Sequence, residues 1–146
     1  MNDLEQLLKL LESEYKKLST NVEAEIMLSN KQLDGALTEQ ITIQIRWERL
    51  SAKVTSGYSL SKDNAEYEFA KAYTNAISDA YKDLSSTDAK FIAGCDVNYA
   101  DAKKLENSYY KLRKEVEAVV DTIESRKYVL KDLTSSIINE VSKTIL

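Results

Sequence analysis

The stretch that decides the fold is residues 105–137, LENSYYKLRKEVEAVVDTIESRKYVLKDLTSSI. Along it, residues of one face recur at alternating steps of four and three, which is the spacing of a coiled-coil seam. This spacing predicts one helix of roughly 40–45 residues, about 60–70 Å long at 1.5 Å per residue. The seam consists of Leu105, Tyr109, Leu112, Val116, Val119, Ile123, Arg126, Leu130, Leu133 and Ile137.

A helix of this length is expected to pack along another long helix, either from the same chain or from a neighbouring copy. Arg126 stands in the seam where an apolar residue belongs. Such a polar seam residue usually sets register or partner choice, although it could instead point a charge into a shared channel. We expect an oligomer interface made by the apolar seam residues Leu105, Tyr109, Leu112, Val116, Val119, Ile123, Leu130, Leu133 and Ile137.

The composition also favours helices. The 146 residues include no proline and three glycines, whereas average usage is roughly 5% and 7%. Sheets and barrels of this size need many tight turns, which draw on these two residues. No repeat or linker indicates a second domain. We therefore predict one all-α domain over residues 1–146, with elongated helices and a long C-terminal helix, packing as an oligomeric helical assembly.

Apolar spacing places two helical segments at the start of the chain. The first covers residues 3–30 and is capped by Asn2 or Asp3. Its acidic polar face is either simply solvated or a docking surface for a basic partner. The second segment covers residues 36–50, where the alternation at residues 42–45 leaves a short strand as the competing interpretation.

The middle of the chain carries the strongest break signals. Ser56-Gly57 predicts a helix end or kink within residues 54–64. A third helical run follows over residues 65–84, and residues 85–88, Ser-Ser-Thr-Asp, form the clearest break.

A short apolar piece then leads into the long helix. Residues 89–93 are either one helical turn or a brief strand. Asp96 or Asn98 caps the long helix that follows, because both side chains can accept a hydrogen bond from a free backbone amide.

The same counts exclude several chemistries. Without histidine the chain has no Ser-His-Asp or Cys-His catalysis, and its single cysteine cannot form an internal disulfide or a Cys-rich zinc site. We expect no enzyme activity, no metal and no cofactor. Cys95 fits a reducing compartment. The apolar runs are too short to span a membrane.

Nucleic-acid binding is compatible with the charge pattern. The net charge of −4 gives no support to a globally basic binder, but the distribution of charge matters more than the total. Residues 103–131 hold eight basic and five acidic side chains, with tyrosines among them. Basic groups with interleaved aromatics suit sequence-neutral single-strand binding. A mixed-charge surface on a long helix has the same composition, so both interpretations stay open.

The run VDTIESRKYVLK at residues 120–131 is similar to the segment (L/V)-D-x-I-x-S-R-x-(F/Y)-x-(I/L)-K of a known family. Asp96 in a short loop, the tyrosine pair at residues 109–110 and the upstream Trp47 match as well. On these features, residues 90–133 resemble the UvsY family of recombination mediators from T-even-type phages. The resemblance covers about a third of the chain.

The resemblance implies a noncatalytic protein that binds single-stranded DNA as a ring-shaped homo-oligomer, such as a heptamer. Its partners would be a phage RecA-like recombinase and the single-strand binding protein that it helps displace, without any membrane. Its location would be cytoplasmic, in the host cell if the protein is phage-encoded. The family's Lys-x-Arg element falls at Lys71-Ala72-Tyr73, where tyrosine replaces arginine and would stack a base instead.

Two functions therefore remain in view. The first is a mediator that binds single-stranded DNA and promotes recombinase loading onto a strand covered by single-strand binding protein. The alternative is a noncatalytic structural or adaptor protein, such as a coiled-coil virion assembly component, that does not bind DNA. The candidate DNA-binding residues are Lys71, Tyr73, Lys90, Lys103, Lys104 and Arg126.

Overall fold

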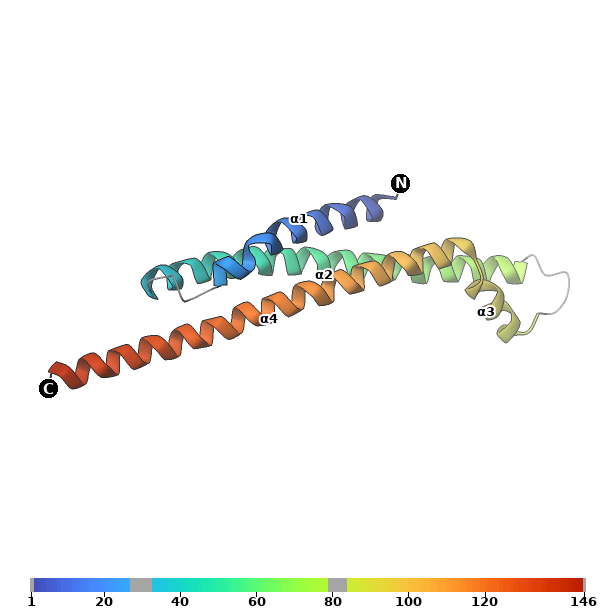
Figure 1. The fold of residues 1–146 in the computed structure, drawn as a ribbon. Helices are drawn as coiled ribbons and strands as arrows, with labels where there is room; N and C mark the ends of the chain where they lie inside the picture. Colours follow the sequence, from blue (N-terminus) through green and yellow to red (C-terminus); the bar gives the residue numbers. More distant parts are fainter. Residues whose placement is uncertain (1, 27–32, 79–83, 146) are drawn as a thin grey trace. The chain divides into compact units, whose positions relative to one another are not determined.

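The computed structural model describes residues 2–26, 33–78 and 84–145. Nearly all of them lie in four α-helices, and none of these described residues is in a strand (Figure 1). The helices are α1 (Asp3–Ile26), α2 (Leu33–Ser78), α3 (Ser86–Gly94) and α4 (Val97–Ile145). The prediction of an all-α fold with a long C-terminal helix is confirmed.

The two long helices exceed the lengths expected from the sequence. Helix α4 has 49 residues, or about 74 Å at 1.5 Å per residue. Helix α2 has 46 residues, so the predicted segments 36–50 and 65–84 belong to one helix. The predicted end or kink within residues 54–64 is wrong, and residues 42–45 are helical rather than a strand.

Side-chain caps fix three helix starts. Asn2 Oδ1 accepts a hydrogen bond from the Leu4 amide at 3.0 Å. Ser85 Oγ accepts one from the amide three residues later at 3.1 Å, and Asp96 Oδ1 does the same at 3.0 Å. These bonds satisfy amides that the first helical turn leaves without a partner. Of the alternatives stated above, Asn2 and Asp96 are therefore the caps, and α3 is a helix.

One predicted boundary lies outside the described residues, because the expected end of the first helix at residue 30 falls within residues 27–32. The expected end of the third run, residue 84, is described and is not helical, whereas residues 79–83 before it lie outside the described part. Within the described part, α1 extends to Ile26 and α2 to Ser78.

The chain divides into two compact units, and α1, α2 and α4 each contribute to both. The first unit consists of Met1–Leu10 and Lys53–Arg113, and the second of Leu11–Ala52 and Lys114–Leu146. The short helix α3 belongs to the first unit, where it lies between the end of α2 and the start of α4 along the chain (Figure 1).

The core of the first unit centres on Tyr109, which is completely buried. Its ring lies against Gly57 of α2, and its hydroxyl donates a hydrogen bond to the Leu4 carbonyl at 2.6 Å. One side chain of α4 therefore contacts both α1 and α2. Small or aliphatic buried residues let the helices approach closely around it, namely Val54, Ser61, Ala65, Ala72, Ala102 and Leu112.

The core of the second unit centres on Trp47, which is 1% exposed. Its ring meets Tyr15 of α1 edge to face, with ring centroids 5.9 Å apart and an interplanar angle of 83°. This arrangement is favourable because the positive edge of one ring meets the negative face of the other. The other buried apolar residues come from all three helices of the unit: Leu11, Val22, Ala36, Ile43, Leu50, Val116, Ile123 and Leu130.

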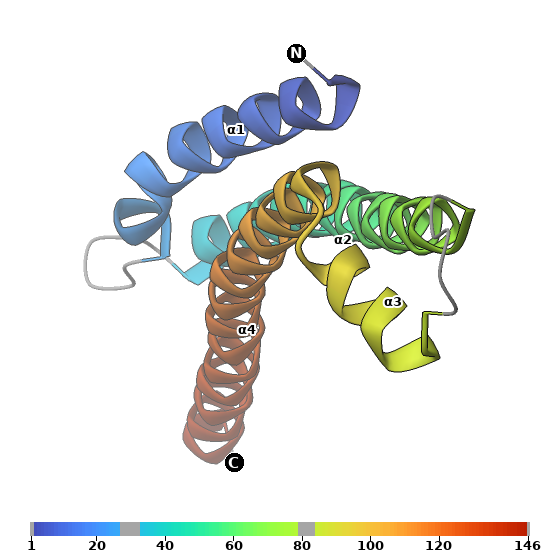
Figure 2. The same cartoon turned by 90° about the vertical axis from the view of Figure 1, so that its right-hand side faces the viewer.

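The predicted seam of α4 is used mainly inside the chain. Its members Tyr109, Leu112, Val116, Ile123 and Leu130 are buried in the single chain, and Leu105 and Val119 are half-buried. Burial removes the five from a surface that another copy can reach, which corrects their assignment to an oligomer interface. Leu133 and Ile137 are 43% and 47% exposed. They lie on the last part of α4, which continues past α1 and α2 of its unit (Figures 1 and 2).

Candidate nucleic-acid interface

Five of the six predicted DNA-binding residues lie in the first unit, and Arg126 lies in the second. On α2, Lys71 is exposed and Tyr73 is half-buried, on either side of the buried Ala72. Residues two apart on a helix do not share a face. Lys71 and Tyr73 therefore cannot both serve one flat contact with a DNA strand.

Helix α3 presents a basic and aromatic surface around Lys90. The helix packs through Ala89 and Ala93, which are 1% and 0% exposed. Lys90 is consequently exposed, and so is Phe91, with 74% of its surface accessible. Phe91 was not among the sequence candidates. The pair of alanines four residues apart was the available signal, because such a pair indicates the buried stripe of a short helix.

The two lysines at the start of α4 have different surroundings. Lys103 Nζ lies 2.8 Å from Glu106 Oε2, and Glu106 is 7% exposed. The hydrogen bond that Lys103 donates to Glu106 is the main cause that raises the pKa of Lys103 above its ordinary value. Lys103 thus stays charged but shares its charge with a carboxylate. Lys104 is exposed, and no described residue pairs with it.

A line of aromatic and charged residues runs along the α2–α4 pair in the first unit. On α4 it is spaced by four and three, and it faces a matching line on α2. At one end the Phe69 and Tyr99 rings lie 5.2 Å apart at 65°. We call this set the α2–α4 strip: Tyr58, Lys62, Glu66 and Phe69 of α2, with Tyr99, Lys103, Glu106, Tyr110 and Arg113 of α4.

The other end of the strip holds a second aromatic group. The Tyr58 and Tyr110 rings lie 5.9 Å apart at 52°. Arg113 Cζ lies 5.3 Å from the centroid of the Tyr58 ring, within the range of a cation–π contact. The strip therefore has an aromatic pair at each end and charged side chains between them.

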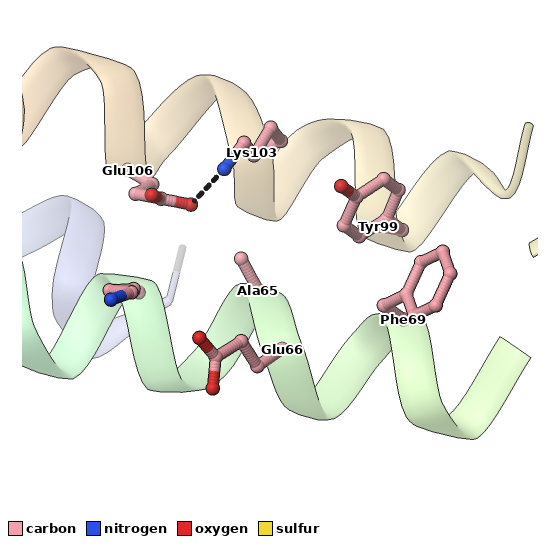
Figure 3. Close-up of a pocket in the computed structure, with 7 residues that line it drawn as sticks. Ala65, Glu66, Phe69, Tyr99, Lys103 and Glu106 are labelled. Atoms are coloured by element: carbon pink, nitrogen blue, oxygen red, sulfur yellow. Dashed lines mark hydrogen bonds and ion pairs between the residues drawn. The ribbon is translucent and has the colours of Figure 1, made fainter. Parts of the chain in front are cut away.

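A pocket of about 270 Å³ opens between the two ends of the strip (Figure 3). Ala65 of α2 is 2% exposed and contributes a small side chain to its lining. The dashed contact between Lys103 and Glu106 lies on the α4 side, and Phe69 and Tyr99 approach each other from opposite helices (Figure 3). Lys62 and Glu66 complete the lining.

Arg126 is not a DNA-contacting residue in this fold, which corrects the prediction. It is 6% exposed, and its Nη1 donates to Gln40 Oε1 at 2.9 Å. Gln40 Nε2 in turn donates to the Ile123 carbonyl at 2.9 Å. Burial lowers the pKa of Arg126, whereas the carboxylates of Glu39 and Glu25 raise it. The side chain therefore lies inside the second unit, where it bonds to α2 and does not face solvent.

Neither unit carries a basic excess. The first has ten basic and eleven acidic residues in its sequence, and the second has ten and thirteen. Any attraction for a polyanion must therefore come from the local arrangement of lysines rather than from the charge of a whole unit.

A metal-binding group and a membrane-spanning helix are both absent from the residues that the structure describes. No three side chains of the metal-ligating types gather in a group there, and none of the helices there has the length and apolar character that crossing a membrane requires. Comparison of the chain with protein-family models, with curated proteins and with solved structures finds no match.

Proposed function

We propose that this protein binds single-stranded DNA and acts as a noncatalytic recombination mediator. The observation that carries the proposal is a group of lysines in the first unit that are exposed and whose ammonium groups have no partner among the described residues, among them Lys71, Lys90 and Lys104. Phe91 and Tyr110 place exposed rings in the same unit. Unpaired cations beside aromatic surfaces are what a sequence-neutral strand binder needs.

The mediator role rests on the resemblance of residues 90–133 to the UvsY family. In this proposal the lysines neutralise phosphates and release the counterions condensed on the strand, which provides affinity without base specificity. The protein holds the strand in a shape that a RecA-like recombinase accepts, while single-strand binding protein is displaced. The chemistry requires no catalytic group.

Assembly into a homo-oligomer, such as a heptameric ring, is part of the proposal. Neither unit of a single protomer has a basic excess, so several copies acting on one strand would raise the effective affinity. The exposed apolar residues at the end of α4 support self-association, because such side chains are usually covered by a partner. They are Leu133, Ile137, Ile138, Val141 and Ile145.

The test is the salt dependence of binding to fluorescent oligo-dT. The observed affinity should fall with salt, with a slope of about −0.7 per phosphate contacted. Replacing both Lys71 and Lys90 by alanine should reduce that slope by about 1.4 per protomer contact. Lys143→Ala is the matched control, since Lys143 is equally exposed but lies in the second unit.

The possible outcomes test separately whether the protein binds DNA and whether Lys71 and Lys90 contribute to that binding. Absence of binding at micromolar protein and low salt refutes the proposal. Binding that is unchanged in the double variant removes Lys71 and Lys90 from the site and leaves the class of function in place.

A structural or adaptor role without DNA is the second candidate. The acidic excess of the second unit and its exposed apolar helix end favour it. Mass photometry combined with the oligo-dT assay distinguishes the two functions, because an adaptor forms oligomers and leaves the DNA free.

A further inference from the structure

We propose that the pocket of the α2–α4 strip accepts one base of the bound strand, and that it favours bases with an exocyclic amino group. This inference rests on the proposed function and names the part of the ligand that enters one site. The site is separate from Lys71, Lys90 and Lys104, and its residues were not among the sequence candidates apart from Lys103.

The charge of the pocket suits a base rather than a phosphate. Its ionisable lining consists of two lysines and two glutamates, so the formal charges cancel. The buried Glu106 carboxylate is already bonded to Lys103 at 2.8 Å. A phosphate placed inside would meet this carboxylate in a poorly solvated position, where like charges repel strongly. A neutral planar group meets no such repulsion.

The aromatic end of the pocket supplies a stacking surface. Phe69 and Tyr99 are both half-buried, and each therefore leaves part of its ring accessible. They are held 5.2 Å apart by packing between α2 and α4, so the surface exists before a ligand arrives. Stacking of bases on aromatic side chains is tolerant of sequence because every base has a π-face.

The preference for an amino group comes from Glu66. Neither the Glu66 carboxylate nor the Lys62 ammonium makes a hydrogen bond or ion pair with any residue that the structure describes, although both residues line the pocket. A free carboxylate accepts hydrogen bonds and donates none. It therefore favours an exocyclic amino group, as when Glu accepts from the N4 amino group of cytosine. Thymine has no such group.

The rest of the strip indicates the path that the bound strand follows along α4. Tyr58 and Tyr110 form the second aromatic pair eleven residues further along α4, a distance of about 16 Å at 1.5 Å per residue. Neighbouring bases can stack there while one base occupies the pocket. The phosphates then remain outside, where Lys104 is exposed.

The experiment compares binding of 20-nucleotide oligo-dC and oligo-dT to the 146-residue chain by fluorescence anisotropy at low salt. We expect oligo-dC to bind about fivefold more tightly than oligo-dT. Glu66→Leu should abolish this difference, because the carboxylate that accepts from the amino group is lost. Tyr99→Leu should weaken binding of both oligonucleotides about tenfold.

Matched variants separate stacking from folding. Tyr67→Leu is the control, because Tyr67 is a 62% exposed tyrosine of α2 outside the strip and its loss should have no effect. Tyr99→Phe keeps the ring and should bind as the unmodified protein does. Helical circular dichroism of every variant confirms that each one is folded.

Three results are possible. Tighter binding of oligo-dC that Glu66→Leu abolishes, together with weaker binding of both oligonucleotides by Tyr99→Leu, supports the proposal that the pocket accepts a base. If the oligonucleotides bind but dC and dT do so equally, or if Tyr99→Leu behaves like Tyr67→Leu, the pocket is refuted and the proposed function stands. If neither oligonucleotide binds, the proposed function fails and the pocket assignment fails with it.

Discussion

Replacing Gly57 by alanine tests how α2 and α4 pack in the first unit. A Cβ atom built at Gly57 would lie 2.5 Å from Tyr109 Cε1, 3.1 Å from Cδ1 and 3.3 Å from Cζ. The ring cannot swing aside, because Tyr109 is fully buried and its hydroxyl is bonded to the Leu4 carbonyl at 2.6 Å. The helices must separate, or the ring must lose that hydrogen bond.

The expected change in the free energy of unfolding follows from three contributions, of which two destabilise the fold and one stabilises it. Overpacking a core by one methyl group destabilises by about 1–3 kcal/mol, and loss of the Tyr109–Leu4 hydrogen bond adds about 1 kcal/mol. Alanine in a helix interior is favoured over glycine by about 1 kcal/mol, which offsets part of the loss. Gly57→Ala should therefore destabilise the fold by about 1–3 kcal/mol, lowering Tm by roughly 3–12 °C for a chain of this size.

The assay is thermal and urea unfolding followed by circular dichroism. Gly35→Ala is the matched control, because it makes the same change in the same helix and its new Cβ would meet nothing within 4 Å. In a Tyr109→Leu background the penalty of Gly57→Ala should disappear, since the contact is lost. If Gly57→Ala raises Tm as Gly35→Ala does, the close approach of Tyr109 to Gly57 is refuted.

Three other predictions concern the second unit. Arg126→Met should lower the free energy of unfolding in urea by about 1–3 kcal/mol, because Gln40 Oε1 loses its donor. Adding Gln40→Leu should restore most of that loss. A double variant less stable than the single one contradicts this. Burial, and secondarily the Glu115 carboxylate, raise the pKa of Tyr15, so stability should be full below about pH 10 and fall above it. Tyr15→Phe should flatten this fall in urea titrations between pH 8 and 11, and an unchanged slope argues against the assignment. Val141→Asp should reduce the oligomer mass in mass photometry without changing helix content, and an unchanged mass removes this end of α4 from the interface.

Local signals in the sequence were sufficient for much of the fold. Asn2 and Asp96 were identified as possible caps because a cap depends on a side chain and an amide two or three residues away. The seam likewise predicted α4, since a helical period can be recognised without knowing which helix packs against it. The prediction at Gly57 failed because its reason lies on another helix, where Tyr109 fills the space that a Cβ would occupy.

The candidate site could be predicted only in part, for the same reason. Exposed lysines are visible in a sequence as charges on a polar face, and Lys71 and Lys90 are indeed exposed. The strip joins Phe69 to Tyr99, thirty residues later, and this pairing depends on the register of two antiparallel helices. Arg126 failed as a DNA contact because a lone cation in a seam has the same sequence pattern whether it faces solvent or Gln40.

Register also determines which part of the seam is left for another copy of the chain. Gln40 bonds to both Ile123 and Arg126, and α2 begins at Leu33, seven residues before Gln40. In an antiparallel pair the start of α2 therefore lies beside α4 near residue 132. Leu130 is the last buried seam residue, and residues 131–145 after it are exposed or half-exposed.

The apolar spacing changes at the same place. Up to Ile137 the seam follows steps of four and three, but Ile137, Val141 and Ile145 are separated by four and four. A stripe with this longer period winds differently around the helix from a heptad seam. The end of α4 thus presents a face distinct from the one that packs inside the chain, so the self-association proposed there would not compete with folding. A substitution such as Val141→Asp can then separate assembly from stability, which a substitution in the buried seam cannot do.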